Sequence, residues 1–308
     1  MQADYSSLLF MLVLIAVGFT ARKVKLLQAE HIDAIPAILL NIAYPALIIR
    51  SITSVEIKNL AKESIVVVIT TFAITLLLFF GGLAVLKRYN NKERKPIILF
   101  ALAIGNITYV ALPVVRAVFG DTGVYYAVLH GSAQDILIWT LYYAYFVGGG
   151  SLSGITVKKL FSPSFIALIV AVVLALLGIR PQGVISDLLQ ALAGLTVPLA
   201  LVYVGGMLAG YGRLKDWIPN RDTVVISLVK VLGVPLIVFG IMQFVLVGYE
   251  IKLLMVVVFS APATILSTIW AKQYGYDEAF AIKTLIFSTL VFLAASCLLF
   301  VFINTGNI

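Results

Sequence analysis

Two polar motifs interrupt apolar segments of this sequence, one in each half. Gly105 to Pro113 reads GNITYVALP, and Ser260 to Thr268 reads SAPATILST. Gly, Asn, Thr and Pro weaken the helical hydrogen-bond ladder, and in hydrocarbon every backbone polar group needs a partner. Such breaks are tolerated where a helix faces protein or a water-filled cavity, as in transporters with discontinuous helices. The chemistry that these residues indicate is therefore reversible binding of a solute.

We expect the substrate to lie at these breaks, because the N-termini of half-helices carry partial positive charge and favour anions. A lone Asn such as Asn106 has an alternative role, a hydrogen bond to a neighbouring helix worth roughly 1 kcal/mol or less. Prolines in such helices are equally compatible with kinks or hinges. The predicted substrate-binding residues are Asn106, Thr108, Tyr109, Pro113, Asn41, Tyr44, Ser260, Pro262 and Thr264.

Ionisable residues inside apolar segments form a second candidate set for coupling. Asp135, with Gln134 and His130 near it, lies in one segment, and Lys230 lies in another. Such charges cost about 2.5–3.5 kcal/mol at a helix centre on insertion scales. Two hypotheses stay open: Asp135 and Lys230 form a permanent buried pair, or one of them titrates and couples transport to protons. His130 has the further alternative of simple packing.

The composition requires a membrane protein. The chain is 62% hydrophobic and 12% charged, with a mean hydropathy of +1.09, whereas soluble proteins carry about 25% charged residues. Its single cysteine, Cys297, allows no internal disulfide. We find no metal-ligand spacing, catalytic nucleophile motif or phosphate-binding loop, so we expect no cofactor, no metal, no nucleic-acid partner and no enzymatic activity.

Hydrophobic runs predict an all-α protein with ten spans. Lys and Arg number 14 in the odd-numbered loops and 5 in the even-numbered loops, which makes the odd loops cytoplasmic and places both termini outside. We therefore expect a multi-pass protein of the inner membrane. The predicted spans are 5–21, 31–54, 63–86, 97–117, 122–147, 163–179, 183–210, 221–246, 251–273 and 278–303.

Five spans on each side of a central linker predict two inverted repeats. The first repeat is 1–148, the cytoplasmic linker is 149–162, and the second repeat is 163–308. Pro45 matches Pro198 when the second and seventh spans are aligned. Aligning Gly105 with Ser260 also matches Gly120 with Gly275, in the turns that lead to the last span of each half.

Four motifs in order resemble the auxin efflux carrier family: NIAYPALIIRSI, GNITYVALPVV, PLALVYVGGML and SAPATILSTIWAKQYGYD. The chain resembles a compact prokaryotic member, and the family is similar in fold to bile acid:sodium symporters. The resemblance implies that broken spans four and nine cross at their prolines, with substrate between a scaffold and a moving crossover domain. It assigns substrate contact to Asn106, whereas Ser260 to Pro262 lacks the second amide of the plant exporters.

These observations together predict a secondary transporter that moves an organic anion by alternating access, as an exporter. The resemblance points to carboxylates such as malate, malonate or an auxin-like acid, and related folds suggest a homodimer surrounded by lipid. An ion-coupled uptake symporter of the bile acid type and an anion channel are the alternatives. Proton coupling or membrane-potential drive is favoured over sodium, because no dense set of oxygen-bearing side chains is evident.

Overall fold

A computed structural model describes residues 5–54, 57–148, 162–210 and 218–304 of the chain. The regular structure of these residues is helical, apart from one isolated bridge between Gly105 and Ala263, which confirms the all-α class. Apart from Ser162, the predicted linker lies outside the described residues. Six helical segments among the described residues are long and apolar enough to cross a membrane: Ala29–Thr53, Ala61–Arg88, Ile107–Val147, Val184–Gly210, Arg221–Gln243 and Glu278–Leu299.

The helices follow the hydrophobic runs in both halves. The first half contains α1 (Tyr5–Lys23), α2 (Ala29–Ile38), η1 (Leu39–Ala43), α3 (Tyr44–Thr53), α4 (Ile57–Val85), η2 (Leu86–Arg88), α5 (Lys95–Ala103), η3 (Ile107–Ala111), α6 (Leu112–Leu137), η4 (Ile138–Tyr142) and α7 (Tyr143–Val147). The second half contains α8 (Pro163–Leu176), α9 (Val184–Gly194), α10 (Thr196–Gly210), α11 (Arg221–Leu228), η7 (Val229–Gly233), α12 (Val234–Gln243), α13 (Tyr249–Ser260), α14 (Ile265–Gln273) and α15 (Glu278–Asn304). The ten-span inverted-repeat topology stays a prediction.

Prolines explain three of the wide helical turns. The π-helical segments η1, η3 and η7 are each followed by a proline at the second residue of the next helix, namely Pro45, Pro113 and Pro235. A proline lacks the N–H donor and its ring pushes away the carbonyl one turn upstream. A π turn absorbs this displacement without ending the helix, so each long segment continues with a local change of direction.

Two matched glycines have the backbone conformation that only glycine adopts readily. Gly120 has φ 63° and Gly275 has φ 72°, in the left-handed region that other L-residues avoid. Gly120 kinks α6 between the predicted fourth and fifth spans, and Gly275 lies between α14 and α15. The two positions aligned from the sequence therefore share one backbone feature.

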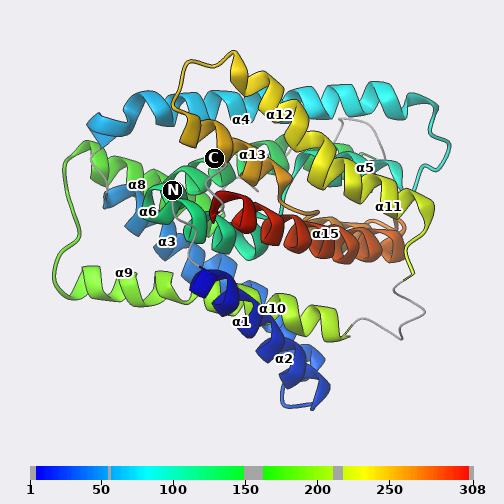
Figure 1. The fold of residues 1–308 in the computed structure, drawn as a ribbon, viewed down its shortest axis with the longest axis horizontal. Helices are drawn as coiled ribbons and strands as arrows, with labels where there is room; N and C mark the ends of the chain where they lie inside the picture. Colours follow the sequence, from blue (N-terminus) through cyan, green and yellow to red (C-terminus); the bar gives the residue numbers. More distant parts are fainter. Residues whose placement is uncertain (1–4, 55–56, 149–161, 211–217, 305–308) are drawn as a thin grey trace.

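The helices pack as two groups. In the first helix group (α1, α2, α3, α8, α9 and α10), α1 packs along α10, and α3 packs against α8 and α9. In the second helix group (α4 to α7 and α11 to α15), α4 packs on α6, α12 on α13, and α11 and α14 on α15. Figure 1 shows α1, α2, α9 and α10 on one side of the molecule and α4, α11 and α12 on the other. The sequence-distant halves are thus interleaved in both groups.

Close backbone contact joins α1 to α10 in the first helix group. A Cβ atom added at Gly18 would collide with the backbone of Val202, and one added at Gly205 would collide with the backbone of Ile15. Small residues permit this approach, which favours van der Waals packing where lipid removes the hydrophobic drive between helices. The first helix group therefore has a tightly fitted pair at its centre.

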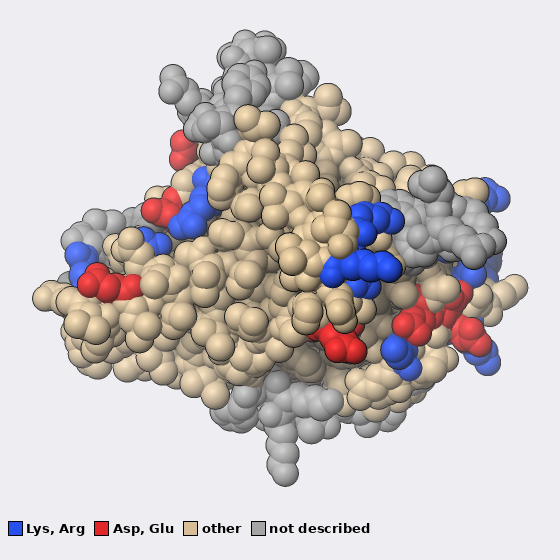
Figure 2. Space-filling view, turned by 90° about the horizontal axis from the view of Figure 1, so that it is seen from below, with Lys and Arg blue, Asp and Glu red and all other residues tan. Residues whose placement is uncertain are grey.

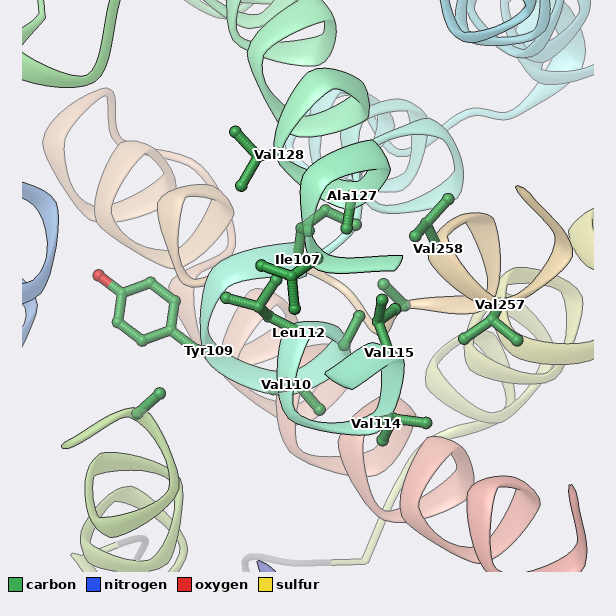
Figure 3. Close-up of a cluster of buried hydrophobic side chains, with 14 of the residues drawn as sticks. Ile107, Tyr109, Val110, Leu112, Val114, Val115, Ala127, Val128, Val257 and Val258 are labelled. Carbon is green, nitrogen blue, oxygen red and sulfur yellow. The ribbon is translucent and has the colours of Figure 1, made fainter. Parts of the chain in front are cut away.

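Apolar and aromatic side chains fill the second helix group. Figure 3 shows Ile107, Leu112 and Val115 of η3 and α6 in a buried cluster with Val257 and Val258 of α13. A second cluster is aromatic: it includes the T-shaped pair Phe79 and Tyr142, whose ring centroids are 4.9 Å apart. These clusters hold the broken segments in place around the crossing described below.

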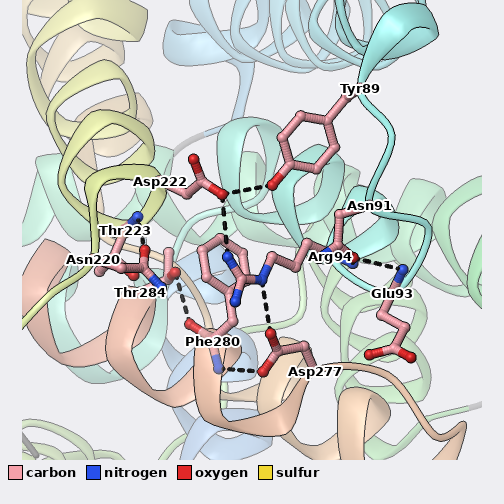
Figure 4. Close-up of polar contacts among 10 residues, drawn as sticks. All are labelled: Tyr89, Asn91, Glu93, Arg94, Asn220, Asp222, Thr223, Asp277, Phe280 and Thr284. Atoms are coloured by element: carbon pink, nitrogen blue, oxygen red, sulfur yellow. Dashed lines mark hydrogen bonds and ion pairs between the residues drawn. The ribbon is translucent and has the colours of Figure 1, made fainter.

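On the face shown in Figure 2, charged side chains lie toward the left end and over the right part of the long axis, with an uncharged surface between them. This distribution suits a protein that spans a membrane along that axis. At one end, Arg94 joins three elements: its Nε donates to Asp277 at 2.7 Å and its Nη1 donates to Asp222 at 3.2 Å. The Tyr89 hydroxyl also donates to Asp222, at 2.7 Å, and Arg94 lies over the ring of Phe280 (Figure 4).

This Arg94 cluster ties the turn between α4 and α5 to the starts of α11 and α15. Partial burial and the hydrogen bond to Asp222 raise the pKa of Tyr89, so its hydroxyl remains a donor at neutral pH. The hydrogen bond to Asp277 raises the pKa of Arg94. The cluster therefore keeps the Tyr89 donor and the Arg94 charge at neutral pH, and it crosslinks the second helix group at one end.

Candidate substrate site

The two broken segments meet at their breaks. After α5, Ile104 turns to an extended conformation, and after α13 the backbone leaves the helical conformation at Ala261. Gly105 pairs antiparallel with Ala263, and the amide of Asn106 donates to the carbonyl of Pro262 at 2.8 Å. The second break thus supplies a hydrogen-bond acceptor to the first, which is how irregular backbone is tolerated at membrane depth.

Glycine is needed at this contact. A Cβ atom added at Gly105 would lie 2.7 Å from the Cβ of Ala261, much closer than two carbon atoms pack. The expectation that the segments cross at both prolines needs correction, because only Pro262 lies in the contact. Pro113 is the second residue of α6, beyond η3, and its effect on the backbone is the π turn before it.

A cavity of about 300 Å³ lies beside the crossing, between the two helix groups. The first helix group contributes residues from α2, η1, α3 and α8, and the second contributes both breaks, α6, η4 and α14. The wall is mostly apolar, with a few polar side chains, as is usual for small-molecule sites. The lining residues are Pro36, Leu40, Asn41, Tyr44, Ile104 to Tyr109, Gly131, Gln134, Asp135, Ile138, Trp139, Ser162 to Ser164, Thr264 to Leu266 and Ile269.

Two helix N-termini lie in this wall. One is the start of η3 at Ile107, which continues into α6, and the other is the start of α14 at Ile265. Thr264 caps α14, its hydroxyl accepting from the amide of Leu266 at 3.4 Å. Free N–H groups and the helix dipole make each N-terminus attractive to an anion. Two such termini on one cavity favour binding of an anion without a basic side chain.

Asn106 lies in the first break, where its backbone contacts the second break. The residue is 3% exposed. Its backbone is fully engaged, because its amide donates to Pro262 and its carbonyl accepts from Val110 and Ala111. Its position is therefore held by the backbone on both sides, while the residue lines the cavity. The side-chain amide, carried by this fixed backbone, is suited to orienting a polar ligand.

Most of the other predicted binding residues also line the cavity, namely Thr108, Tyr109, Asn41, Tyr44 and Thr264. The Asn41 amide donates to the Ala37 carbonyl at 2.8 Å, and the ring of Tyr109 packs on Tyr203 with centroids 5.5 Å apart. Pro113, Ser260 and Pro262 are absent from the lining residues, and the Ser260 hydroxyl donates to the Val257 carbonyl at 2.7 Å.

The predicted coupling residues separate into two pairs. Gln134 and Asp135 line the cavity, whereas His130 and Lys230 do not. His130 is fully buried, with Nδ1 hydrogen-bonded to the Thr71 hydroxyl at 2.9 Å and its ring against Phe259. Lys230 donates to the Leu102 carbonyl at 3.3 Å. Ion pairs among the described residues do not join Asp135 to Lys230, so the structure does not support the permanent pair.

Sequence reasoning missed the apolar part of the wall. Gly131, Ile138 and Trp139 share the face of the helix that carries Asp135, since residues three, four and seven apart align on one helical face. Applying that periodicity to Asp135 identifies them. The hydroxyl of Tyr44 would be 2.8 Å from a Cβ at Gly131, so glycine there leaves room for the tyrosine. Ser162 to Ser164 had no comparable signal.

Two broken helices pair at their breaks, beside a cavity between two helix groups. This arrangement is typical of an integral membrane protein of the transporter type. The chain belongs to the family described as membrane transport protein, the auxin efflux carrier family, whose profile matches residues 5–300. An uncharacterized transporter of Methanothermobacter thermautotrophicus is 23% identical over 291 residues, covering 94% of this chain and 95% of the relative. An uncharacterized transporter of Methanocaldococcus jannaschii is 25% identical over 207 residues, covering 64% and 66%.

Proposed function

We propose that this protein is a secondary transporter that carries an organic anion by alternating access, and that the cavity at the crossing is its binding site. The proposal depends on one observation: two half-helix N-termini and Asn106 line the same cavity. Donors fixed in a low-dielectric wall attract a carboxylate without the desolvation cost of a buried arginine or lysine. The family resemblance favours carboxylates and export.

The location of the cavity supports an elevator type of movement. Its walls come from both helix groups, while the crossing and both N-termini belong entirely to the second group. Sliding of the second helix group along the first would carry the site across the membrane with its geometry intact. The Arg94 cluster and the aromatic cluster crosslink the second group, as a body that moves as a unit requires.

An anion channel is the weaker alternative. A channel needs a continuous polar path or a ring of charges, whereas the cavity wall is mostly apolar and includes aromatic side chains such as Tyr44 and Trp139. Saturable uptake with counterflow distinguishes the two, because a carrier exchanges labelled for unlabelled substrate and a channel does not.

The first test is binding and counterflow with a panel of labelled carboxylates in proteoliposomes. We expect Asn106→Ala to weaken binding about 10- to 100-fold, since a hydrogen bond to a charged group contributes about 1.5–3 kcal/mol. Gln243→Ala is the matched control, because the Gln243 amide is exposed and donates only to Phe239 within its own helix. Unchanged affinity in a folded Asn106→Ala protein would contradict the assignment.

A further inference from the structure

The C-terminus of α5 lies buried at the crossing, where its carbonyl groups need partners. In a continuous helix the Leu102 carbonyl would accept from Asn106 and the Ala103 carbonyl from Ile107. The break removes this pattern, because the Asn106 amide donates to Pro262 instead. A helix C-terminus also carries about half a negative charge. The end of α5 is therefore an electronegative site inside the protein.

Two side chains from other helices satisfy these carbonyls. The Lys230 ammonium donates to Leu102 at 3.3 Å, and the Gln134 amide donates to Ala103 at 3.2 Å. Lys230 is 1% exposed, and the ion pairs of the described residues include none between it and an acid. The buried lysine is thus matched to the end of a half-helix and not to a carboxylate.

Half-helix C-termini and unwound carbonyls are the groups that coordinate sodium ions in transporters with broken helices. Here one such end already holds a covalently attached cation. We propose that the Lys230 ammonium is a built-in cation that occupies the position of a coupling ion at the end of α5, and that transport therefore does not require sodium. This inference rests on the proposed transport function and specifies its coupling.

The surroundings of Lys230 can host a small ammonium ion once the side chain is removed. Ser227 lies about one helical turn before Lys230, so the two residues share a face. Its buried hydroxyl has no partner within the described residues. Truncation of Lys230 would leave the Leu102 carbonyl without its donor, beside a space of lysine-chain size. Methylammonium has the right charge and donors to fill it.

The stability test uses purified protein and does not depend on transport. Lys230→Ala should unfold several degrees below the wild type, and methylammonium should restore most of that loss, whereas tetramethylammonium, which has no N–H donor, should not. Lys283→Ala is the matched control, since Lys283 lies on α15 and is only partly buried. Loss of stability in Lys230→Ala without rescue by methylammonium would overturn the assignment of a cation site.

A second variant covers the case in which Lys230→Ala does not fold. Lys230→Gln keeps a neutral hydrogen-bond donor, on a side chain one atom shorter, and removes the charge. We expect Lys230→Gln to unfold at a lower temperature than the wild type, because the half-helix end then faces a neutral donor. Equal stability would show that the lysine acts only as a donor and would overturn the proposal.

The transport test compares counterflow in sodium and in choline buffers. Wild-type counterflow should be equal in both buffers, and the loss of activity in Lys230→Ala should be reversed by methylammonium. A requirement of the wild type for sodium would overturn the proposal. Absence of counterflow for every substrate would count against the proposed function alone, and the stability measurements would still decide the role of Lys230.

Discussion

Asp135 is an acidic side chain in the wall of the cavity. The helix N-termini in the same wall favour anions. An ionised carboxylate in that wall repels an anionic ligand, and a protonated one can donate a hydrogen bond to it. Protonation of Asp135 therefore strengthens the binding of an anion, and binding of an anion favours the protonated form of Asp135. The cavity geometry favours Asp135 over Lys230 as the group that couples transport to protons.

We expect anion affinity to rise as the pH falls through the titration of Asp135, and to lose this dependence in Asp135→Asn. At neutral pH the variant should bind at least as tightly as the wild type, because the repulsion is absent. Isothermal titration across pH measures both effects. Asp121→Asn is the control, since Asp121 is exposed and paired with Arg116. Wild-type pH dependence in a folded Asp135→Asn protein would rule out this residue.

Residue identity predicted most of the polar residues that line the cavity but not the apolar ones. Asn106, Tyr44 and Thr264 were identifiable because polar groups are rare and costly in an apolar segment. Trp139 and Ile269 were not, because aromatic and aliphatic residues have no distinctive position in a membrane helix. The bond from Lys230 to Leu102 was also unpredictable, since it depends on how two distant helices pack.

At the scale of elements, the crossing depends on the fit between Gly105 and Ala261. We expect Gly105→Ala to destabilise the protein by about 1–3 kcal/mol, the usual cost of overpacking, because the new methyl group meets Ala261 at 2.7 Å. Adding Ala261→Gly should recover part of the loss, which thermal unfolding of the single and double variants measures.

Gly240→Ala is the control for the glycine substitution. Gly240 lies in α12, and a Cβ there meets no atom within 4 Å, so alanine should be neutral or slightly stabilising in a helix. A Gly105→Ala protein as stable as Gly240→Ala would show that the breaks can separate without cost.

The positions of the helices and of both breaks could be predicted from the sequence, because hydrophobic runs and clusters of Gly, Asn and Pro are local signals. Which proline lies in the crossing could not. Pro113 and Pro262 have the same local chemistry, but only Pro262 contributes its carbonyl to the other segment. Pairing of backbones is a long-range property that residue types do not encode directly.

At the scale of the whole molecule, the orientation in the membrane is predicted from the distribution of basic residues. The excess of Lys and Arg in the odd-numbered loops, 14 against 5, predicts that the linker after α7 is cytoplasmic. A cysteine introduced as Gly149→Cys, in a background with Cys297→Ala, should react with a membrane-impermeant maleimide only in inverted vesicles. Reaction in intact cells would reverse the predicted orientation.

The backbone pairing at the crossing also constrains how the protein is made. Gly105 and Ala263 belong to opposite halves of the chain, so the first broken segment is synthesised and inserted well before its partner exists. Until α13 and α14 arrive, the amide of Asn106 lacks its acceptor. An unpaired backbone group is not stable in lipid. The first half must therefore wait in a hydrated or protein-lined place at the insertion machinery, which makes biogenesis a post-insertion assembly of two incomplete halves.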